Sequence, residues 1–210
     1  MPPRPRLGER LHAWIMSRVD RPYERQTAHL KRPLLGRLTG TVVEIGPGTG
    51  PNLKFFVPGI HWIGIEPNPA MHGYLEKEAA RLGLGVELRH GTAERIPLPD
   101  GSADAVVSTL VLCTVPDPAA VVAEALRVLK PGGRFVFLEH VGAPAGTAQL
   151  RFQKRIKPLW RFCAEGCEPD RDTAQVLAAA GFAELHLERL RLPFPIVGPH
   201  VMGVGVKKSN

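Results

Sequence analysis

The sequence predicts an α/β protein built on a doubly wound, mostly parallel sheet of seven strands, with a helical cap at its N-terminus. Between residues 41 and 140, short apolar runs suited to buried strands alternate with segments suited to helices. The first of these runs passes directly into a turn of closely spaced glycines, as the first strand of a doubly wound sheet does. We therefore expect a basic helical cap over residues 1–39 and a single globular unit over residues 40–210.

The glycine turn follows the apolar run Val42–Ile45. Gly46, Gly48 and Gly50 stand at every second position there, and residues without a Cβ let the backbone bend sharply and approach a ligand closely. Pro51 is suited to the first position of a helix, where its missing N–H leaves no hydrogen bond unmade. A strand, a glycine turn and a helix N-terminus together predict a site for a nucleotide-like ligand.

The spacing of these glycines indicates which ligand. A dinucleotide fingerprint needs three glycines in the order G-x-G-x-x-G, whereas this chain reads G-x-G-x-G and then has Pro51. With Glu44 two residues before the first glycine, the stretch resembles motif I of the class I S-adenosyl-L-methionine-dependent methyltransferases. The resemblance implies that S-adenosyl-L-methionine is the cofactor and that Glu44, Gly46, Pro47 and Gly48 bind it.

The next two strands predict the other walls of this site. The run from Ile60 to Ile65 ends at Glu66, about twenty residues after the first glycine, where an acidic side chain accepts hydrogen bonds from ribose hydroxyls in related folds. A third strand, residues 85–89, leads into the loop where this family contacts adenine. The resemblance thus adds four expected cofactor residues, which are Pro67, Gly91, Thr92 and Ala93.

The fourth and fifth strands are separated by a helix with clear boundaries. The continuous apolar run over residues 105–112 is typical of a strand covered on both faces, and by the resemblance its Leu110 is a further cofactor residue. Asp117 caps a helix that begins at Pro118, and residues 130–133 end it before a strand over residues 134–139. Residues 129–133 resemble a motif found at this point in the same methyltransferases.

The C-terminal third predicts a substrate cover and two closing strands. Residues 141–172 are rich in basic and aromatic side chains and lie where this fold inserts a cover over the substrate. A helix over residues 171–180 follows and ends at Gly181. Residues 185–192 and 201–207 are then expected to pair like a hairpin and complete the sheet.

Three further stretches, residues 108–115, 139–141 and 197–203, are similar to the methyltransferase-like thiol S-methyltransferases. This resemblance implies an enzyme that moves a methyl group to a small-molecule acceptor, with a thiol as the expected acceptor. A phospholipid headgroup, a quinone precursor or another small molecule methylated on nitrogen, oxygen or carbon stays open as the alternative, because it would use the same cofactor motifs.

Two histidines are candidates for removing a proton from the acceptor. His140 ends the fifth strand, at the edge where ligands bind in open α/β sheets, and His200 is expected in the loop before the last strand. Each could equally be a structural histidine bonded to backbone. Cys113 is expected to be a small buried hydrophobe. No metal site is predicted, because Cys163 and Cys167 could share a helix face but have too few further ligands nearby.

The positive charge of the chain is concentrated near its N-terminus. Residues 1–40 carry a net charge of +6 out of +7 for the whole chain, and apolar residues there recur at helical spacing. Such a helix could pack over the cofactor site or lie on an anionic membrane surface, and no nucleic-acid-binding module is recognisable. Without an apolar run of about twenty residues, the expected location is the cytoplasm, with peripheral membrane contact left open.

Overall fold

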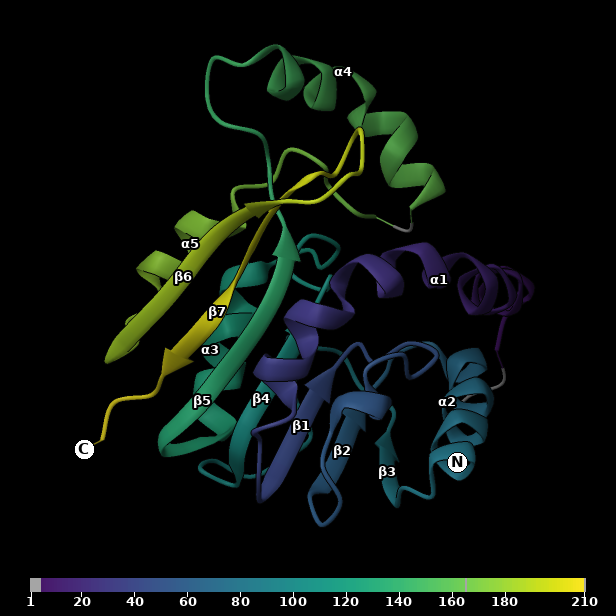
Figure 1. Cartoon of the computed structure of the whole chain (residues 1–210), viewed down its shortest axis with the longest axis vertical. Coiled ribbons are helices and arrows are strands. Elements are labelled where there is room, and N and C mark those ends of the chain that lie inside the picture. The colour runs from purple at the N-terminus through teal and green to yellow at the C-terminus, as the bar shows by residue number, and fades with distance from the viewer. Residues whose placement is uncertain (1–4, 165, 210) are drawn as a thin grey trace.

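The computed structural model describes residues 5–164 and 166–209, and it has the expected α/β architecture (Figure 1). Its helices are α1 (Leu7–Leu35), the 3₁₀ helix η1 (Leu53–Phe55), α2 (Pro69–Leu82), α3 (Pro118–Val128), α4 (Ala148–Cys163) and α5 (Thr173–Ala179). Its strands are β1 (Thr41–Ile45), β2 (His61–Ile65), β3 (Val86–Arg89), β4 (Ala103–Thr109), β5 (Leu129–His140), β6 (Glu184–Arg191) and β7 (Pro199–Val206).

The seven strands form one sheet in the order β3-β2-β1-β4-β5-β7-β6. Strands β1 to β5 pair in parallel, whereas β7 is antiparallel to both β5 and β6. The chain leaves β1 toward one side of the sheet and returns as β4 on its other side. The carboxyl ends of β1 and β4 therefore flank the crevice where doubly wound sheets bind ligands, and the predicted fold class is confirmed.

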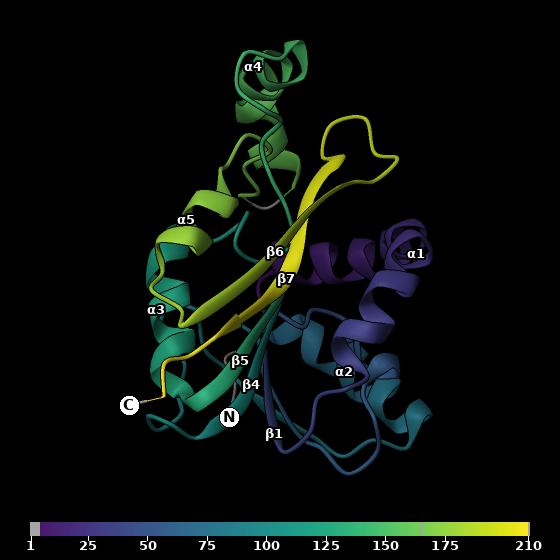
Figure 2. The same ribbon diagram turned by 60° about the vertical axis from the view of Figure 1, so that its left-hand side comes forward.

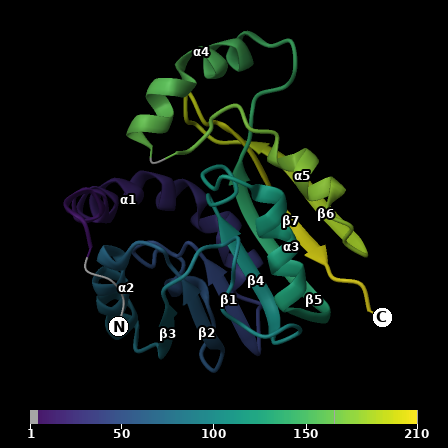
Figure 3. The same cartoon turned by 180° about the vertical axis from the view of Figure 1, so that it is seen from behind.

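Each face of the sheet is covered by its own helices (Figures 1 and 3). On one face, Leu35 of α1 and Leu75 of α2 pack with Val42 and Trp62 of the sheet. On the other face, α3 and α5 pack against a core that includes Phe135. Burial on both faces explains why the central strands are almost continuously apolar.

The helices α1 and α4 rise above the carboxyl edge of the sheet (Figures 1 and 2). The ribbon of α1 changes direction along its length, and Pro22 and Pro33 lie inside the helix, where a proline removes a hydrogen bond and bends the axis. Its second half is fixed by buried polar residues, because the Lys31 ammonium pairs with the Glu24 carboxylate. Asn68 Nδ2 donates to the Glu9 carbonyl oxygen at 3.2 Å and ties the first half to α2.

Several expected boundaries are corrected by the structure. No α-helix begins at Pro51. The segment before Pro58 forms only the three-residue 3₁₀ helix η1, because Leu53, Phe55 and Phe56 are all buried and cannot share one face of an α-helix. The fourth strand ends at Thr109, three residues early, because Leu110 has a φ of 58° that breaks the strand.

The helix that the sequence predicts from Pro118 onward has the expected N-terminal cap. The Asp117 carboxylate accepts hydrogen bonds from the N–H groups of Ala119 and Ala120, directly before Pro118 at the first turn of α3. Asp172 caps α5 by accepting from the Gln175 N–H, so the helix expected over residues 171–180 begins only at Thr173. Among the helices within the described residues, none is both long enough and apolar enough to span a bilayer.

Candidate active site

The glycine turn after β1 adopts a backbone conformation that residues with a Cβ disfavour. Gly46, Gly48 and Gly50 have φ angles of 58°, 56° and 85°, all in the left-handed region. A Cβ on Gly46 would lie 2.7 Å from Cγ2 of Val111, whereas one on Gly48 would meet no atom within 4 Å. The turn is therefore packed tightly at Gly46 and open in front of Gly48, so a ligand can reach the backbone there.

Glu66, directly after β2, connects this turn to the start of α2. Its Oε2 accepts a hydrogen bond from the Gly48 N–H at 3.0 Å, and its Oε1 accepts one from the Asn68 N–H at 2.8 Å. Burial raises the pKa of this carboxyl group, and the two backbone N–H groups oppose that rise. Each oxygen keeps a second lone pair, so the carboxylate can accept ribose hydroxyls while it holds the turn.

Glu44 is a buried residue of β1 whose carboxylate accepts hydrogen bonds from side chains near the glycine turn. Its Oε1 accepts a hydrogen bond from Asn52 Nδ2 at 2.7 Å, and its Oε2 accepts one from Trp62 Nε1 at 3.1 Å. Burial raises the pKa of the Glu44 carboxyl group to about 7. Glu44 thereby anchors Asn52 just after the glycine turn, and direct contact between Glu44 and the cofactor stays a prediction.

The expected adenine loop lies at the carboxyl end of β3. Thr92 and Arg95 form a short antiparallel bridge that turns the chain back on itself. A Cβ on Gly91 would lie 3.3 Å from side-chain atoms of both Ile65 and Pro97, so a larger residue would displace them. Ala93 is buried, whereas Pro67, after β2, is exposed. The segments after β2 and β3 thus extend the carboxyl edge outward from the glycine turn that follows β1.

Leu110 and Glu139 shape the loop that follows β4. Within the described part of the chain, Leu110 is the one non-glycine residue with a positive φ, a strained conformation that is concentrated at functional sites. The buried Glu139 carboxylate accepts hydrogen bonds from the Ser108 hydroxyl at 2.6 Å and from the N–H groups of Val111 and Leu112 at 3.1 Å. Glu139 is a site residue that the sequence patterns did not single out, although an acidic residue at the end of an apolar strand is a usable signal.

His140 and His200 are directly opposite each other on β5 and β7. The position of His200 corrects the sequence prediction, because it lies inside the strand rather than in a loop. The two ring centroids are 6.2 Å apart, and Tyr23 of α1 stacks on His200 at 5.8 Å. His200 donates its Nδ1 proton to the Gly198 carbonyl oxygen at 3.0 Å, and burial lowers the pKa of its ring to about 4. His200 is therefore a neutral ring whose Nε2 carries a free lone pair.

Three buried polar atoms in this group have no hydrogen-bond partner among the residues that the structure describes. They are the Tyr23 hydroxyl, His140 Nδ1 and His200 Nε2. Buried polar atoms are almost always paired in folded proteins. Three unpaired atoms on adjacent rings therefore mark a place where a ligand or water completes the site, and sequence reasoning did not find Tyr23 because its partners lie far away in the chain.

Cys113 and Cys167 meet at His140. The Cys167 sulfur lies 2.8 Å from His140 Nε2 and accepts a hydrogen bond from Trp160 Nε1 at 3.2 Å. The Cys113 thiol, followed by His140 and Trp160, lowers the pKa of Cys167 to about 5, whereas hydrogen bonding to Cys167 and burial raise the pKa of Cys113. Cys163 is the last residue of α4 and Cys167 lies beyond that helix, so the two cysteines do not share the helix face that their spacing would allow.

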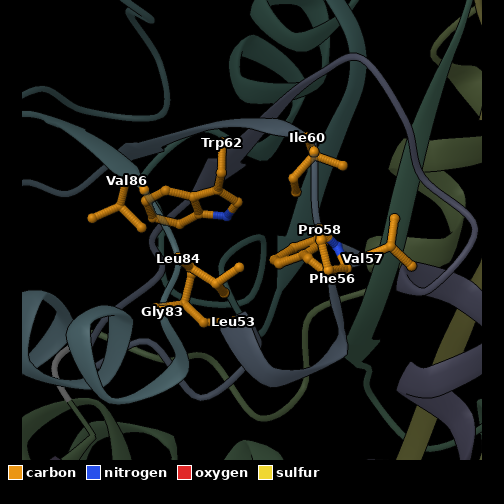
Figure 4. A pocket seen from close by; sticks show the side chains of 11 residues that line it. Leu53, Phe56, Val57, Pro58, Ile60, Trp62, Gly83, Leu84 and Val86 are labelled. Atoms are coloured by element: carbon orange, nitrogen blue, oxygen red, sulfur yellow. The ribbon is translucent and has the colours of Figure 1, made fainter.

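A separate apolar pocket lies on the opposite edge of the sheet (Figure 4). Its lining includes Phe56, Ile60, Trp62, Leu84 and Val86. These residues come from the amino ends of β2 and β3 and from the loops before them. Doubly wound sheets bind ligands at the carboxyl ends of their strands, so this pocket is not the cofactor site.

Comparison with known proteins agrees with the geometry of the carboxyl edge. Residues 43–137 match the family model described as a methyltransferase domain. A thiol S-methyltransferase of Rattus norvegicus is 40% identical over 178 residues, which cover 80% of this chain and 70% of the relative. A demethylmenaquinone methyltransferase of Deinococcus radiodurans is 33% identical over 90% of this chain and 83% of its own length.

Solved structures show the same relationship. An S-adenosyl-L-methionine-dependent methyltransferase from Thermotoga maritima superimposes with a TM-score of 0.64 at 28% identity, over 94% of this chain and all of that one. The residues present also fit the cofactor, because the glycine turn is open at Gly48 and the Glu66 carboxylate stands beside it. The chain therefore belongs to the class I methyltransferases, enzymes for which S-adenosyl-L-methionine is the methyl donor.

Proposed function

We propose that this enzyme methylates the sulfur of a small, fairly apolar thiol. The observation that carries the proposal is the group of three unpaired polar atoms on Tyr23, His140 and His200. His140 lies at the carboxyl end of β5 and His200 at the amino end of the antiparallel β7, beside the loop that Glu139 orders, and Tyr23 stacks on His200. A small acceptor bound there would complete their hydrogen bonds and stand next to the cofactor edge of the sheet.

On the cofactor side, the proposal assigns binding to the residues that the sequence predicts. Gly46, Gly48 and the adjoining Pro47 would receive the cofactor along the turn, Glu66 would hold the ribose, and Gly91 to Ala93 would border the adenine. Leu110 would lie against it from the end of β4. When bound, S-adenosyl-L-methionine supplies a methyl group already activated by its sulfonium, so the protein needs chiefly to align the acceptor.

On the acceptor side, the residues must favour the thiolate over the thiol. A free thiol has a pKa of about 8.5 and is only a few per cent ionised at neutral pH. The free Nε2 lone pair of His200 can accept a hydrogen bond from the incoming thiol, and His140 stands beside it with its Nδ1 unpaired. We therefore assign His200 to orienting the acceptor thiol and His140 to favouring its ionisation.

The rat relative supports the thiol acceptor by its name, and the Deinococcus relative supports a second candidate, a quinone precursor. The two acceptors differ in what they require. Tyr23 stacks on both Phe194 and His200, so a bulky quinone ring is accommodated less readily beside His200 than a small thiol that bonds to the unpaired polar atoms. The packing of Tyr23 therefore favours the thiol.

A panel assay with radiolabelled S-adenosyl-L-methionine tests this proposal. The panel contains apolar thiols, phenols, a demethylated quinone, amines and phosphatidylethanolamine vesicles at equal concentration. We expect thiol methylation at a rate that rises with pH as the thiolate fraction grows. Methylation of the quinone or phospholipid without any thiol product would overturn the acceptor assignment and leave the methyltransferase intact.

We further propose that the enzyme works in the cytoplasm and touches anionic membranes peripherally through the first half of α1. Leu7, Leu11 and Trp14 are exposed there, and basic residues such as Arg10 and Arg18 accompany them on the same helix. An apolar strip with basic neighbours is suited to an anionic bilayer surface. Sedimentation with phosphatidylserine vesicles should pull down the parent chain and much less of the double variant Leu11→Glu, Trp14→Glu.

A further inference from the structure

The side chains of Cys113, His140 and Cys167 form a compact cluster of metal-ligating atoms. Their three ligand atoms all lie within 4.8 Å of one another, and all three residues are buried. They come from the loop after β4, the end of β5 and the segment before α5, so the fold rather than the local sequence brings them together. Two of the three cysteines in the chain are thus gathered around one histidine.

The backbone holds the two cysteine-bearing segments in fixed positions. The Glu168 N–H donates to the Cys113 carbonyl oxygen at 2.8 Å, one residue after Cys167. The Arg171 guanidinium donates to the carbonyl oxygens of Leu112 and Val115, on either side of Cys113. The two sulfur atoms therefore meet because their main chains are joined, and the arrangement is built into the fold.

The surroundings of the Cys167 sulfur resemble those of a metal-bound thiolate. Trp160 Nε1 donates to it at 3.2 Å, and outer hydrogen bonds of this kind fix the orientation of metal ligands. His140 directs its Nε2 toward the same sulfur, which leaves Nδ1 for a second contact. Glu139, the neighbour of His140, accepts hydrogen bonds from the loop that carries Cys113. The positions of His140 and Cys113 are therefore fixed relative to each other as well.

We propose that Cys113, His140 and Cys167 bind one zinc ion and leave its fourth coordination position open for the acceptor sulfur. Two thiolates and an imidazole are preferred zinc ligands, and three protein ligands with one open position are typical of catalytic zinc. With Zn–S distances of about 2.3 Å and Zn–N of about 2.0–2.1 Å, ligand atoms of a tetrahedral site stand about 3.5–3.8 Å apart. The three ligand atoms lie within 4.8 Å of one another, and His140 Nε2 is 2.8 Å from the Cys167 sulfur, so the cluster is close to that spacing.

The role of the open position rests on the proposed thiol acceptor. An acceptor thiol that binds zinc does so as the thiolate and releases its proton to solvent. The sulfur then forms a bond to the methyl carbon while the bond from that carbon to the sulfonium sulfur breaks, and the latter sulfur keeps both electrons. No oxidant or reductant takes part. The thioether product carries no charge and binds zinc weakly, so it leaves.

Metal content tests the site directly and without an activity assay. The full chain, purified with reductant and without chelator, should hold about one zinc ion per molecule by mass spectrometry of the metal. Changes to residues that only hydrogen-bond to a metal ligand weaken metal binding roughly 10- to 100-fold. Cys113→Ser and Cys167→Ser replace ligands themselves, so each should weaken zinc binding by at least that factor. Cys163→Ser is the matched control, because Cys163 is exposed and outside the cluster, and it should bind zinc like the parent.

Cobalt substitution gives a second, spectroscopic readout, which would be absent if the two cysteines and His140 only packed against one another. Co²⁺ in a two-sulfur, one-nitrogen tetrahedral site should give sulfur-to-cobalt absorption in the near ultraviolet and intense visible bands, and Cys163→Ser should keep both. A thiol acceptor added to this form should shift the visible bands. Folded protein that binds S-adenosyl-L-methionine but holds neither metal, or a Cys113–Cys167 disulfide in reductant-purified protein, would overturn the proposal.

The two proposals fail in different ways. If protein without zinc methylates a thiol and chelator has no effect, the metal site is refuted and the thiol acceptor stands. If the protein holds one zinc ion per molecule but methylates only a quinone or phospholipid, the metal site stands and the thiol acceptor is refuted.

Discussion

The two carboxylates at the cofactor end and the three rings at the acceptor end of the same sheet edge differ in how many of their hydrogen bonds the protein supplies. At β1 and β2, all four carboxylate oxygens of Glu44 and Glu66 already accept hydrogen bonds from the protein. At β5 and β7, the rings of Tyr23, His140 and His200 keep three polar atoms without a partner within the described residues.

This difference indicates how each ligand is recognised. The cofactor end is held in shape by the protein alone, so its ligand meets preorganised groups and little ordering is needed on binding. The acceptor end has hydrogen bonds still to be made, so specificity there depends on a ligand that supplies them. Variants that disturb the first end should therefore alter cofactor affinity, and variants at the second end should alter turnover.

The largest effect is expected for Gly48→Val. A β-branched residue at a φ of 56° is strained, and its side chain would fill the open space beside the turn. The strain and the lost backbone contact together should weaken S-adenosyl-L-methionine by about 1,000-fold, measured by calorimetry. Gly101→Val is the control, since Gly101 has a φ of 60° and open space but lies far from the site; equal losses in both variants would refute a specific role for Gly48.

Glu44→Gln should change how stability depends on pH. The pKa of Glu44 is raised to about 7 in the folded protein. At pH values between the pKa in the unfolded chain and this raised pKa, the folded protein therefore holds a proton on Glu44 that the unfolded chain has lost. The parent should therefore be most stable below the unfolded pKa and lose up to about 3 kcal/mol as pH rises through 7. The variant should lack this loss, because Asn52 can turn its unpaired Oδ1 toward the new amide.

Denaturant unfolding at a series of pH values from 5 to about 8 measures this difference. The exposed Glu76 provides the matched control, and Glu76→Gln should follow the parent at every pH. A parent and Glu44→Gln variant with parallel stability curves would show that Glu44 is ionised in the fold.

His140→Ala should reduce turnover with the thiol by about 100-fold near neutral pH, within the range for groups that assist proton removal. The deficit should shrink at alkaline pH, where the thiol ionises without help, and the affinity for S-adenosyl-L-methionine should stay unchanged. The control His186→Ala replaces an exposed histidine on β6. A deficit that is constant over pH would exclude a role of His140 in ionising the thiol, and a loss of cofactor affinity would show that the variant also disturbs the cofactor end.

The smallest of the four effects is expected for Glu66→Ala. Loss of charge-assisted hydrogen bonds to the ribose should weaken S-adenosyl-L-methionine by about 2 kcal/mol, or about 30-fold. The Gly48 N–H also loses its acceptor in this variant, so thermal unfolding is measured beside calorimetry, with Glu76→Ala as control. Lower stability with normal affinity would show that Glu66 serves the turn and not the cofactor.

The sequence predicts the cofactor end well because its signals are local. Residues 42–50 carry a strand and a turn in nine consecutive positions, and the φ angles of Gly46, Gly48 and Gly50 agree with that pattern. The error over Pro51 arises because a favourable helix start says nothing about how far the helix continues. Here burial of Phe55 and Phe56 decided the conformation instead.

The acceptor end was mostly beyond sequence reasoning because its contacts are long-range. Cys113, His140 and Cys167 are separated by 27 residues at each step along the chain, and only the pairing of β5 with its neighbours brings them together. Tyr23 reaches His200 from the far end of the chain. The sequence predicts His140 at the sheet edge and His200 in the loop before the last strand, but it does not predict the neighbours that the two histidines share.

The left-handed Leu110 has a consequence for attempts to make this enzyme more heat-resistant. Glycine at that position would relieve a backbone penalty of roughly 1–2 kcal/mol, so an algorithm or selection that rewards only folding would replace it. The replacement would also remove the side chain expected against the cofactor and loosen the loop that carries Cys113. At position 110, a substitution that raises thermal stability is thus expected to lower activity, and Leu110 should be kept when the rest of the chain is redesigned.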